Sequence, residues 1–264
     1  MRRAGTPMHR RGGRSTLRIP ALLIAAAMVA FAPRADDAFA QISYGGGPQA
    51  YQSIAPAYIG VDFTFDGGEL PESSFEFVEP VWGIVYSRPG FSFSAARGVQ
   101  DASDSDDLTL IDVLLLGYGA FTPFRSETRA FELLVPVGLS SGYRKVSRNS
   151  ASSVIQAFEF TTFSIGAGLG LGHRTEKTNL LIRAMPFYGL ATRSIGNENG
   201  STATFDTDVE LGLGPFSDRI GVTLGYGFRW QKWNLKASAL FEGISDETFD
   251  YSGTMHTFRV GVLF

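Results

Sequence analysis

The sequence predicts an all-β protein: a single antiparallel transmembrane β-barrel of about ten strands, preceded by a cleavable signal peptide. Three observations predict this class. The N-terminus is basic and then apolar, apolar and polar residues alternate with period two through most of the remaining chain, and the last strand ends on an aromatic residue. Such alternation places apolar side chains on one face of a strand. The 264 residues include no cysteine, so no disulfide can hold the fold together.

The first 40 residues predict a secretory signal peptide. Residues 1–18 contain several arginines and no acidic residue, an apolar run follows over 19–32, and Ala38-Phe39-Ala40 has the A-x-A pattern of a cleavage site. The apolar run is shorter than the roughly 20 residues that a membrane helix needs. We therefore expect a signal peptide over 1–40, a periplasmic lead-in over 41–56 and a barrel over 57–264.

The alternation predicts ten strands, with eight and twelve as alternatives. The doubtful stretch is 204–214, which reads either as part of a long connection over 194–218 or as an extra strand. Short and long connections alternate along the chain, as in barrels with short turns at one end and long loops at the other. The expected strands span 57–65, 80–87, 90–98, 107–121, 129–141, 154–172, 178–193, 219–230, 232–243 and 253–264.

A hairpin turn is expected at Gln231-Lys232, between the eighth and ninth of these strands. In that register Trp230 pairs with Trp233, and one face of both strands is apolar while the other is polar or small. A slip of one residue would invert the two faces, so the pattern favours this pairing.

The last residues carry the most specific signal. Phe258, Val260, Val262 and Phe264 share one face of a strand, and the sequence stops at Phe264. This ending resembles the C-terminal strand of bacterial outer-membrane β-barrel proteins. The resemblance implies export to the outer membrane, a barrel-insertion signal formed by these four residues and read by the insertion machinery, and contacts with outer-membrane lipids and lipopolysaccharide. It indicates no subfamily.

Eight charged side chains are expected to face the barrel lumen if the apolar face points toward lipid. Their signs balance, and a narrow lumen hydrates isolated charges poorly, so we expect them to pair. The resulting network would either plug the lumen or form a charged constriction in a small pore. The eight residues are Asp62, Asp112, Glu132, Arg183, Arg229, Lys236, Glu242 and Arg259.

Three further features suggest sites. The glycines of segment 166–172 alternate, which indicates a strand that leaves room for a bulky neighbour and not a nucleotide-binding loop. His256 is the candidate base if the barrel were a Ser–His enzyme. Arg144, Lys145 and Arg148 lie in an expected loop over 142–153 and are candidates to contact lipopolysaccharide phosphates.

Four functions remain open at this point. The favoured one is a non-enzymatic barrel with a structural or surface-interaction role and at most a narrow pore, because open porins use about 16–18 strands. The alternatives are a small-solute porin-like channel, an outer-membrane lipid-modifying enzyme, and a secreted soluble β-barrel that binds an apolar ligand. Without the expected signal peptide, the chain has 16 basic and 24 acidic residues and a formal net charge of −8, which argues against nucleic-acid binding. No cofactor or metal is expected, and small solutes are candidate partners.

Overall fold

The computed structural model describes residues 52–65, 74–101, 107–128, 130–148, 157–192, 200–217, 220–236 and 248–264. The expected signal peptide lies outside these residues, as do residues 41–51 of the expected lead-in. Residues 53–56 of that lead-in belong to the first strand of the barrel. Among them there is no helix long and apolar enough to cross a membrane. The strands are β1 (Ser53–Phe65), β2 (Phe75–Phe77), β3 (Val81–Arg88), β4 (Phe91–Gln100), β5 (Leu108–Arg125), β6 (Phe131–Arg148), β7 (Ala157–Ala167), β8 (Leu169–Arg174), β9 (Thr178–Thr192), β10 (Gly200–Ser217), β11 (Ile220–Lys236) and β12 (Thr248–Leu263).

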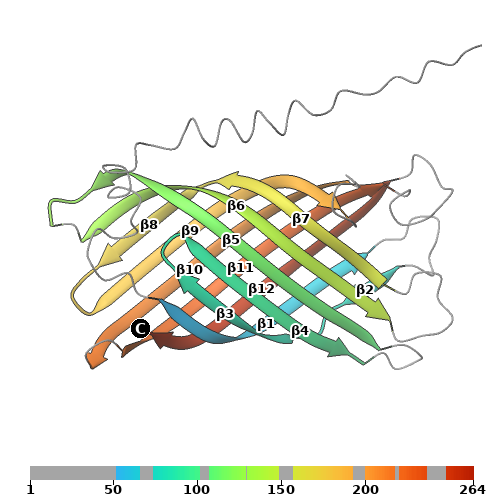
Figure 1. Cartoon of the computed structure of the whole chain (residues 1–264), viewed down its shortest axis with the longest axis horizontal. Helices are drawn as coiled ribbons and strands as arrows, with labels where there is room; N and C mark the ends of the chain where they lie inside the picture. The colour runs from blue at the N-terminus through green and yellow to red at the C-terminus, as the bar shows by residue number, and fades with distance from the viewer. Residues whose placement is uncertain are drawn as a thin grey trace, which may run out of the picture. The chain divides into compact units, whose positions relative to one another are not determined.

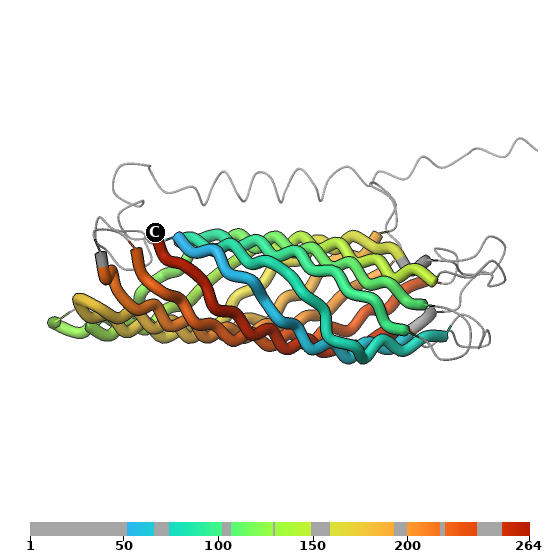
Figure 2. Tube along the Cα trace, turned by 90° about the horizontal axis from the view of Figure 1, so that it is seen from below, coloured from blue at the N-terminus to red at the C-terminus, as the bar shows by residue number. Residues whose placement is uncertain are grey.

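These segments build one closed antiparallel ring of ten strands. β2 and β3 pair with β1 in a single register, so they are one strand interrupted at residues 78–80. β7 and β8 likewise share one register against β6 and β9 and are interrupted at Gly168. The ring closes where β12 pairs with β1, seen as red beside blue in Figure 2. A closed ring leaves no unpaired strand edge, which is what a sheet in lipid requires.

The two ends of the barrel differ. Gln52 and Phe264 exchange two backbone hydrogen bonds of 2.9 Å, so the first described residue and the last residue lie at the same end. The short connections between β3 and β4, β5 and β6, and β8 and β9 lie there too (Figure 1). We call this the turn end. The opposite end, where β1 stops and β12 starts, is the loop end.

The expected count of ten strands is confirmed, although two expected strands are in fact one and a further strand lies within an expected connection. These two differences cancel in the count. The hairpin at Gln231-Lys232 does not exist, because β11 runs unbroken from Ile220 to Lys236 and pairs along its length with β10 and β12. Gln-Lys lacks the positive-φ preference of tight hairpin turns. The supposed long connection over 194–218 contains β10, a strand of 18 residues.

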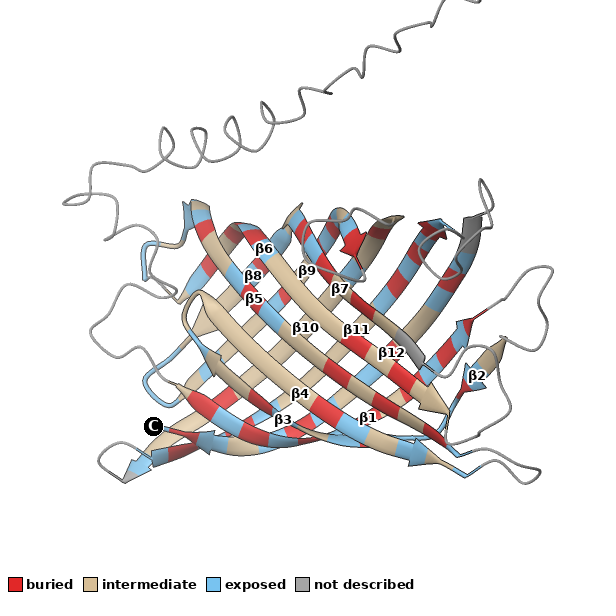
Figure 3. Ribbon diagram, turned by 45° about the vertical axis from the view of Figure 1, so that its right-hand side comes forward, coloured by how far each residue is buried: buried red, intermediate tan, exposed pale blue. Residues whose placement is uncertain are grey.

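The two faces of a strand exchange polarity part-way along the barrel. Near the turn end, β11 and β12 point apolar side chains such as Leu224 and Val260 outward. Nearer the loop end, β11 points Lys232 outward, and the inward positions are filled by Trp233 and, on β12, Tyr251. On β11 buried and exposed residues alternate at both ends of the strand with the same parity, separated by residues 225–229, which are of intermediate exposure (Figure 3).

β1 shows the same exchange and explains two incorrect predictions. Tyr58 points outward from its turn-end half, whereas Asp62 points outward from its loop-end half, opposite the buried Phe63. Asp62 and Lys236 therefore lie on the outer wall and not in the lumen, because both sit beyond the level at which polarity inverts. Glu242, the third of the expected lumen charges near this end, lies outside the described residues.

The barrel thus has two zones along its axis. The turn-end zone has the apolar exterior of a membrane barrel, and the loop-end zone has the polar exterior and apolar interior of a water-soluble barrel. Membrane strands need about 9–11 residues, while β5, β6 and β10 each have 18. The strands therefore extend beyond the bilayer at the loop end.

Exposed aromatic side chains mark the other membrane boundary. At the turn end, Phe121 is 66% exposed and Phe216 is 70% exposed, and Phe124, Phe131 and Phe264 are also exposed. A belt of aromatic residues at the interface is a regular feature of membrane barrels.

The level of the polarity exchange can be tested with two lysine substitutions on β12. Val260 is 59% exposed within the apolar zone, so we expect Val260→Lys to lower the free energy of unfolding by about 2–4 kcal/mol in lipid vesicles. Thr254→Lys, on the same strand beyond the exchange, should cost less than about 1 kcal/mol. Urea titration followed by tryptophan fluorescence measures both, and equal losses would contradict the assignment.

Candidate functional site in the barrel lumen

An apolar cluster fills the lumen at the loop end, and we call it the plug. Its aromatic members come from several strands around the ring, and Trp233 packs edge-to-face on Tyr251 with ring centroids 5.6 Å apart. Phe160 reaches Trp233 from β7 at 5.8 Å. The largest side chains of the plug are at most 2% exposed, and they are Phe63, Phe65, Phe77, Phe160, Trp233 and Tyr251.

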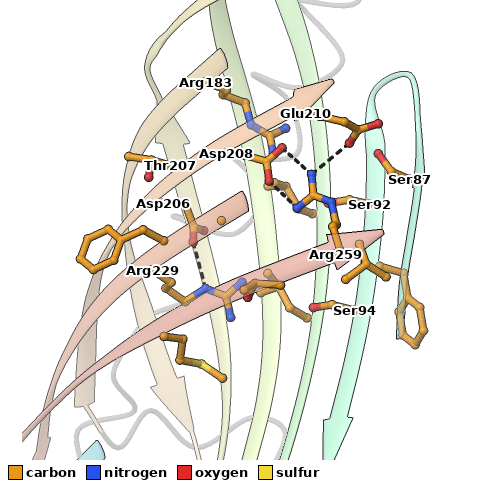
Figure 4. Close-up of a pocket in the computed structure, with 18 of the residues that line it drawn as sticks. Ser87, Ser92, Ser94, Arg183, Asp206, Thr207, Asp208, Glu210, Arg229 and Arg259 are labelled. Atoms are coloured by element: carbon orange, nitrogen blue, oxygen red, sulfur yellow. Dashed lines mark hydrogen bonds and ion pairs between the residues drawn. The ribbon is translucent and has the colours of Figure 1, made fainter. Parts of the chain in front are cut away.

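A network of charged side chains lies directly on the turn-end side of the plug. It combines four carboxylates with four guanidinium groups, so its formal charge is balanced. Part of it is shown in Figure 4. Its members, which we call the lumen network, are Asp112, Asp206, Asp208, Glu210, Arg144, Arg183, Arg229 and Arg259.

Asp112 connects opposite walls of the barrel. Its Oδ1 accepts a hydrogen bond of 2.7 Å from Nε of Arg144 on the neighbouring β6, and its Oδ2 lies 3.4 Å from Nη1 of Arg229 on β11. In the ring, four strands separate β5 from β11 in either direction. Arg229 also donates to Asp206 at 2.9 Å. Two cations and two carboxylates therefore span the lumen at one level.

Arg144 joins the network to the plug. Besides its bond to Asp112, it donates to the Tyr251 hydroxyl at 3.1 Å and to the Met255 sulfur at 2.8 Å. Its guanidinium carbon lies 5.0 Å from the centroid of the Phe63 ring. Because this side chain is only 3% exposed, each of these contacts replaces water that the cation has lost.

Arg259 holds the second part of the network together. From β12 its guanidinium donates to both carboxylate oxygens of Asp208, at 2.7 and 3.0 Å, and to Glu210 at 3.0 Å, although both acids belong to β10. It passes over the intervening β11 at Gly225, which pairs with Arg259 on one side and Glu210 on the other. A Cβ at Gly225 would collide with the Arg259 side chain.

Arg183 completes this part of the network from β9. Its Nη2 lies 3.9 Å from Asp208, which pairs with it across the two strands. Its guanidinium also stacks over the Tyr118 ring, with the carbon 4.4 Å from the ring centroid. A cation–π contact of this kind gains strength where water is excluded.

The structure brings together four of the eight expected lumen charges: Asp112, Arg183, Arg229 and Arg259. Glu132 also faces inward but lies nearer the turn end, where it pairs with Arg125 at 2.9 Å. Asp62 and Lys236 face outward, as described above. Half of the lumen network therefore consists of residues from the expected set of eight.

The other four members were missed for identifiable reasons. Asp206, Asp208 and Glu210 lie in 204–214, for which the sequence left both a long connection and an extra strand open. Their alternation with Phe205, Val209 and Leu211 is that of a strand, and the structure places them in β10. Arg144 was assigned to a loop that is in fact the loop-end part of β6. It therefore cannot contact lipopolysaccharide, and its neighbour Lys145 is the outward-facing residue.

The glycines of segment 166–172 face inward, as expected from their alternation. A Cβ at Gly166 would overlap the ring of Phe187, and one at Gly168 would meet the backbone of Met185. Both of these side chains are buried on β9. The missing side chains of one strand thus make room for the large side chains of the next.

Little space is enclosed near the lumen network. The cavity beside Arg183, Asp208 and Arg259 has a volume of about 90 Å³, and a second one beside Arg144 has about 10 Å³. A buried water needs about 10–15 Å³ of such volume. The first cavity therefore holds a few water molecules, and the second scarcely one.

The described histidines lie outside the lumen network. His256 points outward, and its Nδ1 is 2.9 Å from the Tyr226 hydroxyl, while Nδ1 of His173 is 2.8 Å from the Ala130 carbonyl. Within the described part of the chain, no recorded contact joins either of them to a serine, and no cluster of three His, Asp or Glu residues could hold a metal ion.

Two glycines of β11 give a matched test of the path of Arg259. Gly225→Ala should displace the Arg259 guanidinium from Asp208 and Glu210 and lower the free energy of unfolding by about 3 kcal/mol, as expected for a broken buried ion pair. Gly227→Ala faces the same lumen, but its Cβ would find its nearest atoms at an ordinary 3.6 Å. It should cost less than about 1 kcal/mol. Denaturant unfolding in vesicles would refute the account if both variants lost the same amount.

The fold is similar to solved bacterial outer-membrane barrels. The outer-membrane protease OmpT from Escherichia coli shares 9% identity over 84% of this chain and 97% of that chain, with a TM-score of 0.41. The translocator domain of autotransporter NalP from Neisseria meningitidis shares 12% identity over 92% of this chain and 96% of that chain, with a TM-score of 0.35. Ail, the attachment invasion locus protein of Yersinia pestis, shares 11% identity over 80% of this chain and 99% of that chain, with a TM-score of 0.25.

No protein-family model matches the chain, and no curated protein sequence matches it. The architecture itself is unambiguous, because a closed antiparallel ring combines an apolar outer band with inward-facing paired charges. Only helices and closed barrels satisfy the backbone in lipid, and this arrangement of faces is that of a membrane barrel. The chain folds as a closed antiparallel β-barrel of the transmembrane type.

Proposed function

We propose that the protein is a closed, non-catalytic outer-membrane barrel that serves as a rigid support for a surface-interaction role outside the membrane. The observation that carries this proposal is the apolar plug resting on a charge-balanced lumen network. Both layers lie across the lumen, and the cavities beside the described lumen network measure about 90 and 10 Å³. The barrel's wall and interior are therefore built for stability and not for passage.

Opening such a lumen would be costly. A solute moving past Asp112 would have to separate it from Arg144 or Arg229 in a site where Asp112 is only 9% exposed. Removing one partner of a buried ion pair typically costs about 3–5 kcal/mol, because a charge remains without compensation. The plug adds a second barrier of packed aromatic rings on the loop-end side.

The loop-end zone supports the surface-interaction role. Its exterior carries ion pairs between neighbouring strands, with Lys145 3.4 Å from Glu159 and Lys232 3.1 Å from Asp250. These pairs are too exposed to add much stability. Ion pairs on the outer wall support a loop-end zone that lies in water, and the packed plug inside supports its role as a rigid base.

Planar-bilayer recording separates this proposal from the porin-like alternative. We expect the refolded wild-type barrel, Asp112→Ala and Arg183→Ala all to remain silent, because the plug is unchanged in each. Steady ion-selective openings that either substitution alters would establish a channel instead. The enzyme alternative has its own test: hydrolysis of phospholipid or lipid A that His256→Ala abolishes would overturn the non-catalytic proposal.

A further inference from the structure

A groove crosses the apolar outer wall of the turn-end zone. It has a volume of about 590 Å³ and extends over five neighbouring strands of the ring, β10, β11, β12, β1 and β3. This volume lies within the range of about 300–1,000 Å³ that is common for small-molecule sites. Its lining is almost entirely apolar and includes Tyr58, Trp82, Leu211, Leu224, Phe258 and Val260.

Two rows of paired residues form the groove. The row nearer the loop end is aromatic, since Phe258 pairs with Tyr58 on one side and Tyr226 on the other, and Tyr58 pairs with Trp82. The Tyr58 and Trp82 rings meet edge-to-face at 5.3 Å. The row nearer the turn end consists of smaller aliphatic residues, such as Pro56, Val260, Leu224 and Leu211. Large residues beside small ones give the wall its hollow.

The groove has a polar rim on its loop-end side. His256 is the next outward-facing residue of β12 toward the loop end, two positions from Phe258. Its Nδ1 is 2.9 Å from the hydroxyl of Tyr226, which lines the groove. The His256 ring also lies 5.1 Å from that of Phe228. On β12 the outward residues change from apolar to polar at His256, whereas on β11 the exposed Trp230 still lies beyond Phe228. His256 therefore lies within the boundary between the apolar and the polar exterior.

We propose that this groove binds an acyl chain of a membrane lipid, with the phosphate-bearing head group at His256. The groove faces hydrocarbon, so an acyl chain is the material that fills it in the membrane. A chain lying in a hollow touches more protein atoms than one against a convex wall, and dispersion contacts add with their number. The imidazole supplies a ring nitrogen that can donate to a phosphate oxygen.

The arrangement favours a lipid over a second copy of the protein. A self-complementary dimer contact requires a surface patch that fits itself across a two-fold axis, and a hollow bordered by large aromatic rings does not fill a second hollow. A flexible acyl chain adapts to the depression, and the single polar pair at its end matches an amphiphile with one head group.

The test uses lipid retention by the full-length mature barrel. Wild-type protein is refolded into vesicles of dimyristoylphosphatidylglycerol, dissolved in a mild non-ionic detergent and washed by repeated size-exclusion chromatography. Native mass spectrometry then counts the phospholipid that each barrel retains. Leu211→Trp fills the groove, and Ile165→Trp, which is outward-facing and 61% exposed on β7 outside the groove, is the matched control. Heat-modifiable migration on gels confirms that each variant is folded.

We expect the wild type and Ile165→Trp to retain phospholipid equally, and Leu211→Trp to retain at least about threefold less because the filled groove loses its packing contacts. His256→Ala should also retain less, and Thr254→Ala should match the wild type. The proposal fails if the wild type retains no lipid, or if both tryptophan variants lose it alike. It also fails if the wild type is a dimer that Leu211→Trp converts to a monomer, which would assign the groove to a second copy.

Discussion

The structure depends on one constraint: a charge enclosed in a narrow lumen must be matched by an opposite charge within hydrogen-bonding distance. Asp112 shows how this constraint shapes the barrel, since its two carboxylate oxygens face Arg144 and Arg229 from different walls. Around it, cross-strand pairing places Arg183 opposite Asp208 and Arg229 opposite Asp206. Where the nearest acid lies two strands away, Gly225 opens the path for Arg259. The network thus fixes which residues can occupy the neighbouring lumen positions.

The second constraint is the change of solvent along the barrel axis. In lipid, the exterior must be apolar, and the interior carries the charges; beyond the lipid, the exterior must be polar, and the interior can be apolar. Each strand meets both demands by keeping its alternation and exchanging the polarity of its faces. Arg144 stands at the boundary inside, with Asp112 on one side and the rings of Phe63 and Tyr251 on the other. Closure of the lumen follows from both zones together.

The sequence predicted the class and the ten-strand ring because these depend on local alternation and on the last strand. It did not predict the change of polarity, since period-two alternation does not show which face meets lipid at which height. Asp62, Lys236 and Trp233 were misplaced for this reason. The hairpin at Gln231-Lys232 looked consistent only because its second half lay beyond the exchange. β10 remained one of two readings of 204–214, because the role of Asp206, Asp208 and Glu210 becomes clear only with Arg229, Arg259 and Arg183 opposite them.

The central claim is that Asp112 and Arg229 join opposite walls of the barrel across the lumen and thereby stabilise its fold. A double-mutant cycle tests it most directly, with the free energies of unfolding of wild type, Asp112→Asn, Arg229→Gln and the double variant measured by denaturant titration in vesicles of one composition. The account predicts a coupling energy of about 1–3 kcal/mol, the range for residues that share one ion-pair network. Losses that add to within about 0.3 kcal/mol would show that the two walls are not joined at this point.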